Sequence, residues 1–124
     1  MILITGSAGK TGRSVLQALV DRDLPVRALV HRADQCSIVQ SLGAVDVIVG
    51  DMRSPEIMQQ AVRGVEAVYH IPPNMSPDEL SIGQHAIRAA RSAGVEHFVF
   101  HSVLKPQIKA MPHHWNKMLV EEQL

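Results

Sequence analysis

Three glycines stand three residues apart near the start of the chain, at Gly6, Gly9 and Gly12. They follow a short apolar run and precede an apolar stripe of helical period. The first glycine lets the chain turn sharply off a strand, the second lets backbone approach an anion, and the third lets a helix pack closely on a sheet. The helix start adds free N–H groups and about half a positive charge. The spacing predicts a site for a dinucleotide pyrophosphate. The predicted contacts include the residues between the glycines, which are Ser7, Ala8, Lys10 and Thr11.

This loop has two alternative interpretations. Gly9-Lys10-Thr11 looks like the end of a phosphate-binding P-loop, but that motif needs a glycine where this chain has Ile4, so the spacing argues against it. A glycine turn that binds no ligand is the other alternative.

The choice of cofactor depends on the residues after the second apolar run. A site for NAD usually has an acidic residue about twenty positions after the glycines. This chain has His31 and Arg32 there. A guanidinium can hold a 2′-phosphate with two charge-assisted hydrogen bonds, whereas a carboxylate would repel it. Arg32 therefore predicts NADP, and Lys10 could contact the same phosphate. Each could instead be a solvated surface residue.

Further candidates follow the third and fourth apolar runs. Asp51 could accept a hydrogen bond from the adenine amino group, with Met52 as apolar cover, or it could make an Asx-turn. Pro72 and Pro73 would keep the chain extended past the nicotinamide ribose, or serve only as loop residues.

The candidate catalytic residues lie toward the end of the chain. Ser102 closes the fifth apolar run, where its hydroxyl could orient a substrate carbonyl. His113 and Lys117 are four residues apart and share a helical face, so a proton donor and an ammonium would lie together. The alternatives are a strand-end serine and a surface pair between Lys117 and Glu121. The inward face of this helix is predicted to carry Trp115, Met118 and Leu119.

Composition limits the classes of function. The chain has 124 residues, twelve basic and twelve acidic side chains, and one cysteine, Cys36. We expect a single domain in a reducing compartment, the cytoplasm, with no nucleic-acid or membrane partner. The seven histidines do not cluster at metal-ligand spacing, so no metal site is expected.

Apolar runs at residues 2–5, 26–30, 45–49, 67–71 and 97–102 are predicted strands. Helical segments alternate with them, which predicts an α/β fold with a doubly wound parallel sheet ordered 3-2-1-4-5. Ligands would then bind at the carboxyl ends of strands one and four.

The helix ends also have signals in the sequence. Ser54 followed by proline predicts a helix start, and Gly64 its end. Residues 76–79 have the pattern of a capping box with proline at the first helical position, and Gly94 ends that helix. Asp34 is predicted to cap a short helix that ends at Gly43.

Taken together, the segments ITGSAGKTGRSV, VRALVHR, GVEAVYHIPP, GVEHFVFHSV and HHWNKMLVEEQL, with the Gly-Asp after strand three, resemble the NmrA-like family. These atypical short-chain dehydrogenases/reductases include NAD(P)H-dependent quinone and isoflavone-type reductases and redox-sensing regulators. The resemblance implies that Gly6, Gly9, Gly12 and Arg32 bind NADP and that Lys117 matches the lysine of the last nucleotide-site helix. Typical short-chain dehydrogenases carry Tyr-x-x-x-Lys, and this chain has His113 in place of the tyrosine.

The expected function is an NADPH-dependent oxidoreductase acting on a quinone or similar carbonyl acceptor. The alternative is a non-catalytic module that senses NADP(H) and regulates or binds a partner, because some members of the family bind cofactor without catalysis. We expect residues 1–124 to be the NAD(P)-binding domain of a longer protein, truncated before strand six. Apolar surface along strand five or its helix would then be uncovered and would favour self-association.

Overall fold

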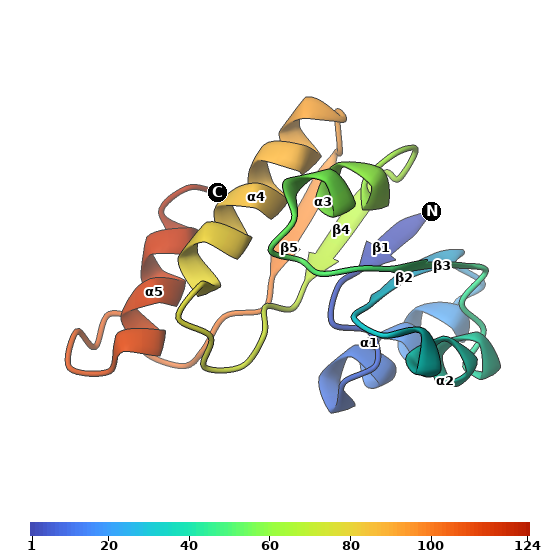
Figure 1. The fold of residues 1–124 in the computed structure, drawn as a ribbon, viewed down its shortest axis with the longest axis horizontal. Helices are drawn as coiled ribbons and strands as arrows, with labels where there is room; N and C mark the ends of the chain where they lie inside the picture. The colour runs from blue at the N-terminus through green and yellow to red at the C-terminus, as the bar shows by residue number, and fades with distance from the viewer.

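A computed structural model describes residues 1–124, which form a five-stranded parallel sheet in the order β3-β2-β1-β4-β5 (Figure 1). The predicted fold class and strand order are confirmed. The strands are somewhat shorter than the apolar runs, because the last residues of most runs already belong to loops. Their bounds are β1 Ile2–Ile4, β2 Val26–Val30, β3 Asp46–Val49, β4 Ala67–His70 and β5 His97–Phe100.

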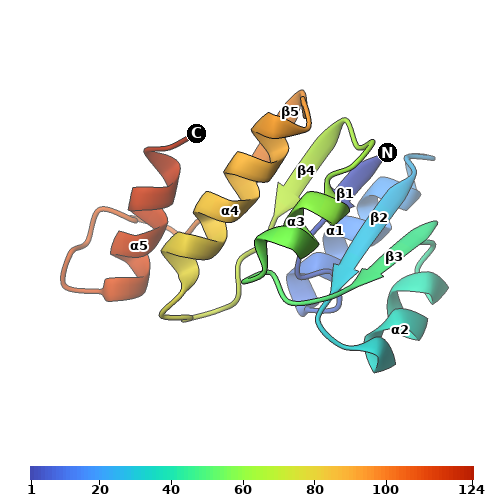
Figure 2. The ribbon, with the colours of Figure 1, turned by 45° about the horizontal axis from the view of Figure 1, so that its top comes forward.

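The helices cover both faces of the sheet, with α1 and α2 on one face and α3 and α4 on the other (Figure 2). Helix α5 packs against α4 at one end of the molecule. None of the helices is both long and apolar enough to cross a bilayer. The helix bounds are α1 Lys10–Val20, α2 Cys36–Ser41 after a 3₁₀ turn η1 Ala33–Gln35, α3 Pro55–Ala61, α4 Glu79–Ser92 and α5 Pro112–Glu121.

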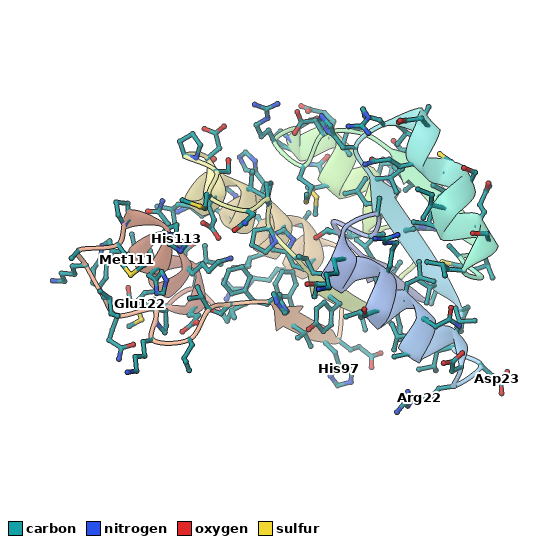
Figure 3. The ribbon with its side chains drawn as sticks, turned by 90° about the horizontal axis from the view of Figure 1, so that it is seen from below. Arg22, Asp23, His97, Met111, His113 and Glu122 are labelled. Carbon is teal, nitrogen blue, oxygen red and sulfur yellow. The ribbon has the colours of Figure 1, made fainter.

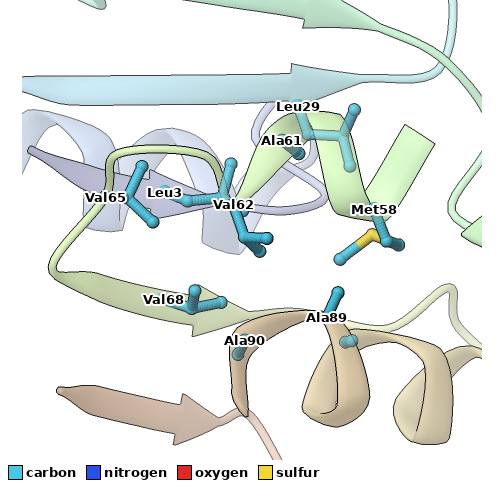
Figure 4. Close-up of a cluster of buried hydrophobic side chains, with 10 residues drawn as sticks. Leu3, Leu29, Met58, Ala61, Val62, Val65, Val68, Ala89 and Ala90 are labelled. Atoms are coloured by element: carbon cyan, nitrogen blue, oxygen red, sulfur yellow. The ribbon is translucent and has the colours of Figure 1, made fainter. Parts of the chain in front are cut away.

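Successive strand residues point to opposite faces, so the sheet builds two apolar cores. Leu3 and Leu29 belong to the core under α3 and α4, which Figure 4 shows with Met58 and Val68. Ile4, next to Leu3 in the chain, belongs to the core under α1 and α2. Burial of both faces explains why the strands are runs of Val, Ile and Leu rather than alternating patterns.

The predicted helix ends are confirmed in part. Ser54 caps α3 by accepting a hydrogen bond from the Ile57 N–H (3.3 Å). Gly64 and Gly94 follow α3 and α4 with positive φ angles of 69° and 70°, which end a helix without steric cost.

Two predicted caps are wrong. The segment 76–79 is not a capping box: Ser76 accepts the Asp78 N–H (3.2 Å), and α4 begins only at Glu79. Asp34 lies within η1 and caps nothing. The side-chain oxygen of Gln35 instead accepts the N–H of Arg32 (3.0 Å). In both places the side chain expected to form the cap makes another contact. Glu79 is buried in the interior, and Asp34 pairs with a neighbouring arginine.

The predicted inward face of α5 is also wrong. The buried residues of this helix are Lys117 and Val120, whereas Trp115, Met118 and Leu119 are only half-buried. The helix is rotated about its axis relative to the prediction, because the charged side chain of Lys117 has a partner inside the protein.

Candidate functional site

A cleft of about 780 Å³ opens at the carboxyl edge of the sheet, and the loops that follow all five strands line it. Strands β1 and β4 lie side by side in the sheet, but the chain leaves them in opposite directions, toward β2 and β5. This reversal of winding separates the two loops and leaves a crevice, as doubly wound sheets do where they bind ligands. The cleft therefore lies where the sequence predicted it.

The glycine loop forms one wall of the cleft. Gly6 has a positive φ of 62°. A Cβ at Gly12 would clash with the backbone oxygen of Gly6 and lie 2.7 Å from the Ser7 Cα. Only glycine allows this contact between the loop and the first turn of α1. No side chain caps the amino end of α1, so its first N–H groups are available to an anion in the cleft.

The loop residues divide into two groups. Ala8, Gly9, Lys10 and Thr11 line the cleft with Gly6 and Gly12. Ser7 does not, because its side chain is fully buried and its hydroxyl donates to the Ile4 carbonyl (2.6 Å). The side chain of Ser7 anchors the loop to the sheet and does not face a ligand.

Arg32 lies outside the cleft lining, which includes His31 and Gln35 from the same segment. The Arg32 side chain is 63% exposed and donates to Asp34, with 3.0 Å between Nε and Oδ1. This hydrogen bond lowers the pKa of Asp34. The guanidinium expected to select NADP is thus already paired with a carboxylate two residues away.

The loop after β3 brings an unpredicted arginine to the cleft. Asp51 makes the Asx-turn that was one of its two interpretations, accepting the Arg53 N–H (2.9 Å), and it also binds the Arg53 guanidinium (2.6 Å to Nη2). Hydrogen bonds from Arg53 lower the pKa of Asp51 to about 2. Met52, Pro72 and both of these charged residues line the cleft. The sequence pattern Asp-x-Arg, with opposite charges two residues apart, could have predicted this ion pair.

The end of β5 and the start of α5 form the opposite wall. Ser102, His113 and Lys117 all line the cleft, and Figure 3 shows His113 on the first turn of α5. The Oγ of Ser102 is buried and has no hydrogen-bond partner in the protein. An unpartnered hydroxyl at this position is free to bind a polar ligand group.

Lys117 is not a surface residue. Its Nζ lies 2.5 Å from Glu79 Oε1, 3.4 Å from the His101 carbonyl oxygen and 5.3 Å from the centre of the Phe100 ring. The alternative of a surface pair with Glu121 is therefore wrong. Glu79 gave no signal of this role, because its position in the sequence suggested a helix cap.

A buried histidine lies at the end of β4. His70 is fully buried, with its Nδ1 2.9 Å from the Thr5 hydroxyl and its Nε2 without a partner. Burial and the nearby charge of Lys117 lower the pKa of His70 to about 3, so the ring is neutral. Directly after β5, His101 lines the cleft, and its Nδ1 contacts the Tyr69 hydroxyl (3.1 Å). Both histidines lie within apolar runs, so no local pattern predicted their role.

Known reductases are similar to this chain in sequence or in structure. An NAD(P)H azoreductase from Xenophilus azovorans is 36% identical over 99 residues, which is 80% of this chain and 34% of the relative. A triphenylmethane reductase from Citrobacter sp., solved in complex with NADP(H), matches with a TM-score of 0.86 at 25% identity, over 98% of this chain and 44% of that one. An NADPH-dependent quinone oxidoreductase from Escherichia coli matches with a TM-score of 0.78 at 25% identity, over 98% of this chain and 42% of that one.

The chain spans about a third of the length of the curated relative. The model of the NmrA-like family matches residues 1–124. With the glycine loop, the strand order and the lysine of α5 in place, the chain belongs to the NmrA-like family.

Proposed function

We propose that residues 1–124 form the NADP(H)-binding domain of an NADPH-dependent oxidoreductase that reduces a quinone or a similar carbonyl acceptor. The observation that carries the proposal is the uncapped amino end of α1, which opens with Gly6, Gly9 and Gly12 into a cleft at the switch point of the sheet. The relatives support it, since they include an NAD(P)H azoreductase, a triphenylmethane reductase in complex with NADP(H) and an NADPH-dependent quinone oxidoreductase.

The residues of the cleft fit such a cofactor. The close contact of Gly12 with the backbone of Gly6 holds the loop against the first turn of α1, where the uncapped N–H groups would bind the pyrophosphate. Lys10 would contact the 2′-phosphate from within the cleft and Arg32 from outside its lining, on release from Asp34. Asp51, Met52 and Pro72 would lie along the adenine and ribose groups. Lys117 would hold a ribose hydroxyl at the far end, beside Ser102 and His113. When bound, NADPH supplies a hydride for reduction, and Ser102 would orient the acceptor carbonyl while His113 donates a proton.

The acceptor site and the partners belong to the same proposal. The length of the relatives suggests that residues beyond this domain provide the pocket for the acceptor. Val99 on β5 is 48% exposed, and this apolar surface supports an expected self-association of the domain alone. The single cysteine, Cys36, supports a reducing compartment such as the cytoplasm.

A second function is supported by one observation. His113 stands where typical short-chain dehydrogenases have tyrosine, and its position at a helix start beside His114 is also that of an ordinary surface residue. The alternative is a non-catalytic module whose occupancy by NADP(H) regulates a partner.

The test is titration of the protein with NADPH and NADH, followed by cofactor fluorescence. We expect saturable binding of both and tighter binding of NADPH. The Gly12→Ala variant should lose binding, because its Cβ clashes with the loop backbone. Ser14→Ala, an exposed change on the same helix, is the matched control. No binding to the parent protein would contradict the proposal, and equal affinities would contradict the assignment to NADP.

NADPH oxidation with a panel of quinones, measured on the full-length protein, separates the enzyme from the regulator.

A further inference from the structure

The first residue of α4 places a carboxylate in the interior of the protein. The Glu79 side chain is fully buried, and neither of its oxygens accepts a hydrogen bond from any group apart from its ion pair with Lys117. Burying a carboxylate without a partner is very costly, so such groups are found paired. The position of Glu79 therefore depends on Lys117, and that of Lys117 on Glu79.

The groups around the Lys117 ammonium include only one that is anionic. On β4, His70 is neutral because its pKa is lowered to about 3. The loop after β5 contributes the His101 carbonyl oxygen, and β5 contributes the face of the Phe100 ring. His113 lies one turn earlier on the same helix and lines the same cleft. Glu79 alone balances the charge of a side chain that is 11% exposed.

The same two helices meet at a second point one turn further along. A Cβ at Gly83 would lie 2.6 Å from Val120 Cγ2, so α4 and α5 approach closely there. Gly83 follows Glu79 by four residues, and Val120 follows Lys117 by three, so each pair shares a helical face. The apolar contact holds the helices together, and the ion pair lies at the end of α4 that faces the cleft.

We propose that Glu79 is a positioning residue that fixes the Lys117 ammonium in the cleft, where it contacts the nicotinamide half of the bound dinucleotide. This inference rests on the proposed function. It differs from a structural role for Glu79, in which the ion pair would only attach α5 to α4.

Two ligands separate these roles. NADPH spans the cleft, whereas adenosine 2′,5′-bisphosphate carries only the adenine half of the cofactor and does not reach Lys117. In Glu79→Gln we expect NADPH to bind about tenfold more weakly or worse, as for a lost charge-assisted hydrogen bond. Adenosine 2′,5′-bisphosphate should bind as in the parent protein. Calorimetry measures both dissociation constants.

Two further variants test whether Glu79 affects NADPH binding through Lys117. The double variant Glu79→Gln with Lys117→Met should bind NADPH no more weakly than Lys117→Met alone, because the two residues act as a unit. Val120→Ala loosens the same helix pair without touching a charge, so it should lower the melting temperature and leave NADPH binding unchanged.

A variant that keeps the carboxylate separates loss of its position from failure of the chain to fold. If Glu79→Gln does not fold, Glu79→Asp keeps the charge but displaces it, and should weaken NADPH alone.

Three results would overturn the role of Glu79: equal weakening of both ligands, additive losses in the double variant, or an NADPH loss in Val120→Ala as large as in Glu79→Gln. A parent protein that binds neither ligand overturns the proposed function as well. A parent that binds both, with a Glu79→Gln variant that binds NADPH normally, overturns only the inference.

Discussion

The ion pair between Arg32 and Asp34 bears directly on cofactor choice. Both side chains are exposed, and a 2′-phosphate would have to compete with Asp34 for the guanidinium. We therefore expect Asp34→Asn to strengthen NADPH binding and raise the preference over NADH. Arg32→Glu should weaken NADPH while leaving NADH largely unaffected. Fluorescence titration of both cofactors checks this, and unchanged ratios in both variants would show that the phosphate binds elsewhere.

His70 should make the stability of the protein depend on pH. Its pKa of about 3 in the folded protein lies below the ordinary value of 6.5, so the unfolded state binds more protons between these values. The free energy of unfolding should fall as pH decreases below about 6.5, by up to about 1.4 kcal/mol per pH unit. Urea unfolding at several pH values measures this slope.

Substitution isolates the contribution of this histidine. His70→Asn should flatten the slope, whereas His97→Asn, at an exposed position on β5, should leave it as in the parent. A slope that survives in His70→Asn would assign the effect to other groups.

At the scale of secondary-structure elements, Arg27 connects α3 to the sheet through hydrogen bonds. Its guanidinium donates to the carbonyl oxygens of Ala61 (2.8 Å) and Arg63 (2.6 Å) at the end of α3, and to Asp46 on β3 (2.6 Å). These bonds satisfy helix carbonyls that otherwise lack partners. Arg27→Met keeps the apolar stem but should lower the free energy of unfolding by about 1–3 kcal/mol.

The matched control for this prediction is Arg22→Met. Arg22 lies in the turn after α1, is exposed and donates to the Ala18 carbonyl of that helix (2.7 Å), so its loss should change stability by no more than about 0.5 kcal/mol. Similar losses in both variants, measured by urea unfolding, would show that the contacts of Arg27 across elements add nothing.

For the molecule as a whole, the cleft spans both halves of the sheet. The glycine loop, the segments after β2 and β3, and the segments after β4 and β5 all line it, so a bound dinucleotide would contact both halves. A ligand at one hundred times its dissociation constant stabilises the folded state by about 2.7 kcal/mol. We expect NADPH to raise the melting temperature more than NADH at equal concentration. The same shift for both, or none, would argue against selective binding in the cleft.

The sequence by itself determined the architecture and one wall of the site. Strand runs, Ser54 with its proline, and the three glycines act through backbone geometry over a few residues, so their effects can be deduced without the rest of the chain. The strand order follows because alternating strands and helices allow few right-handed windings. The position of the cleft follows from that order.

Only the tertiary structure decided which charged side chains are buried and with which partner. In the sequence Glu79 looks like part of a helix cap and Lys117 has Glu121 as its only suggested partner, yet the two meet because α4 and α5 pack at Gly83 and Val120. Ser7 looks like a ligand contact, yet its hydroxyl reaches carbonyl oxygens of the sheet. The reason is physical: burial and ion pairing depend on distances between segments that are remote in sequence, and no local pattern specifies those distances.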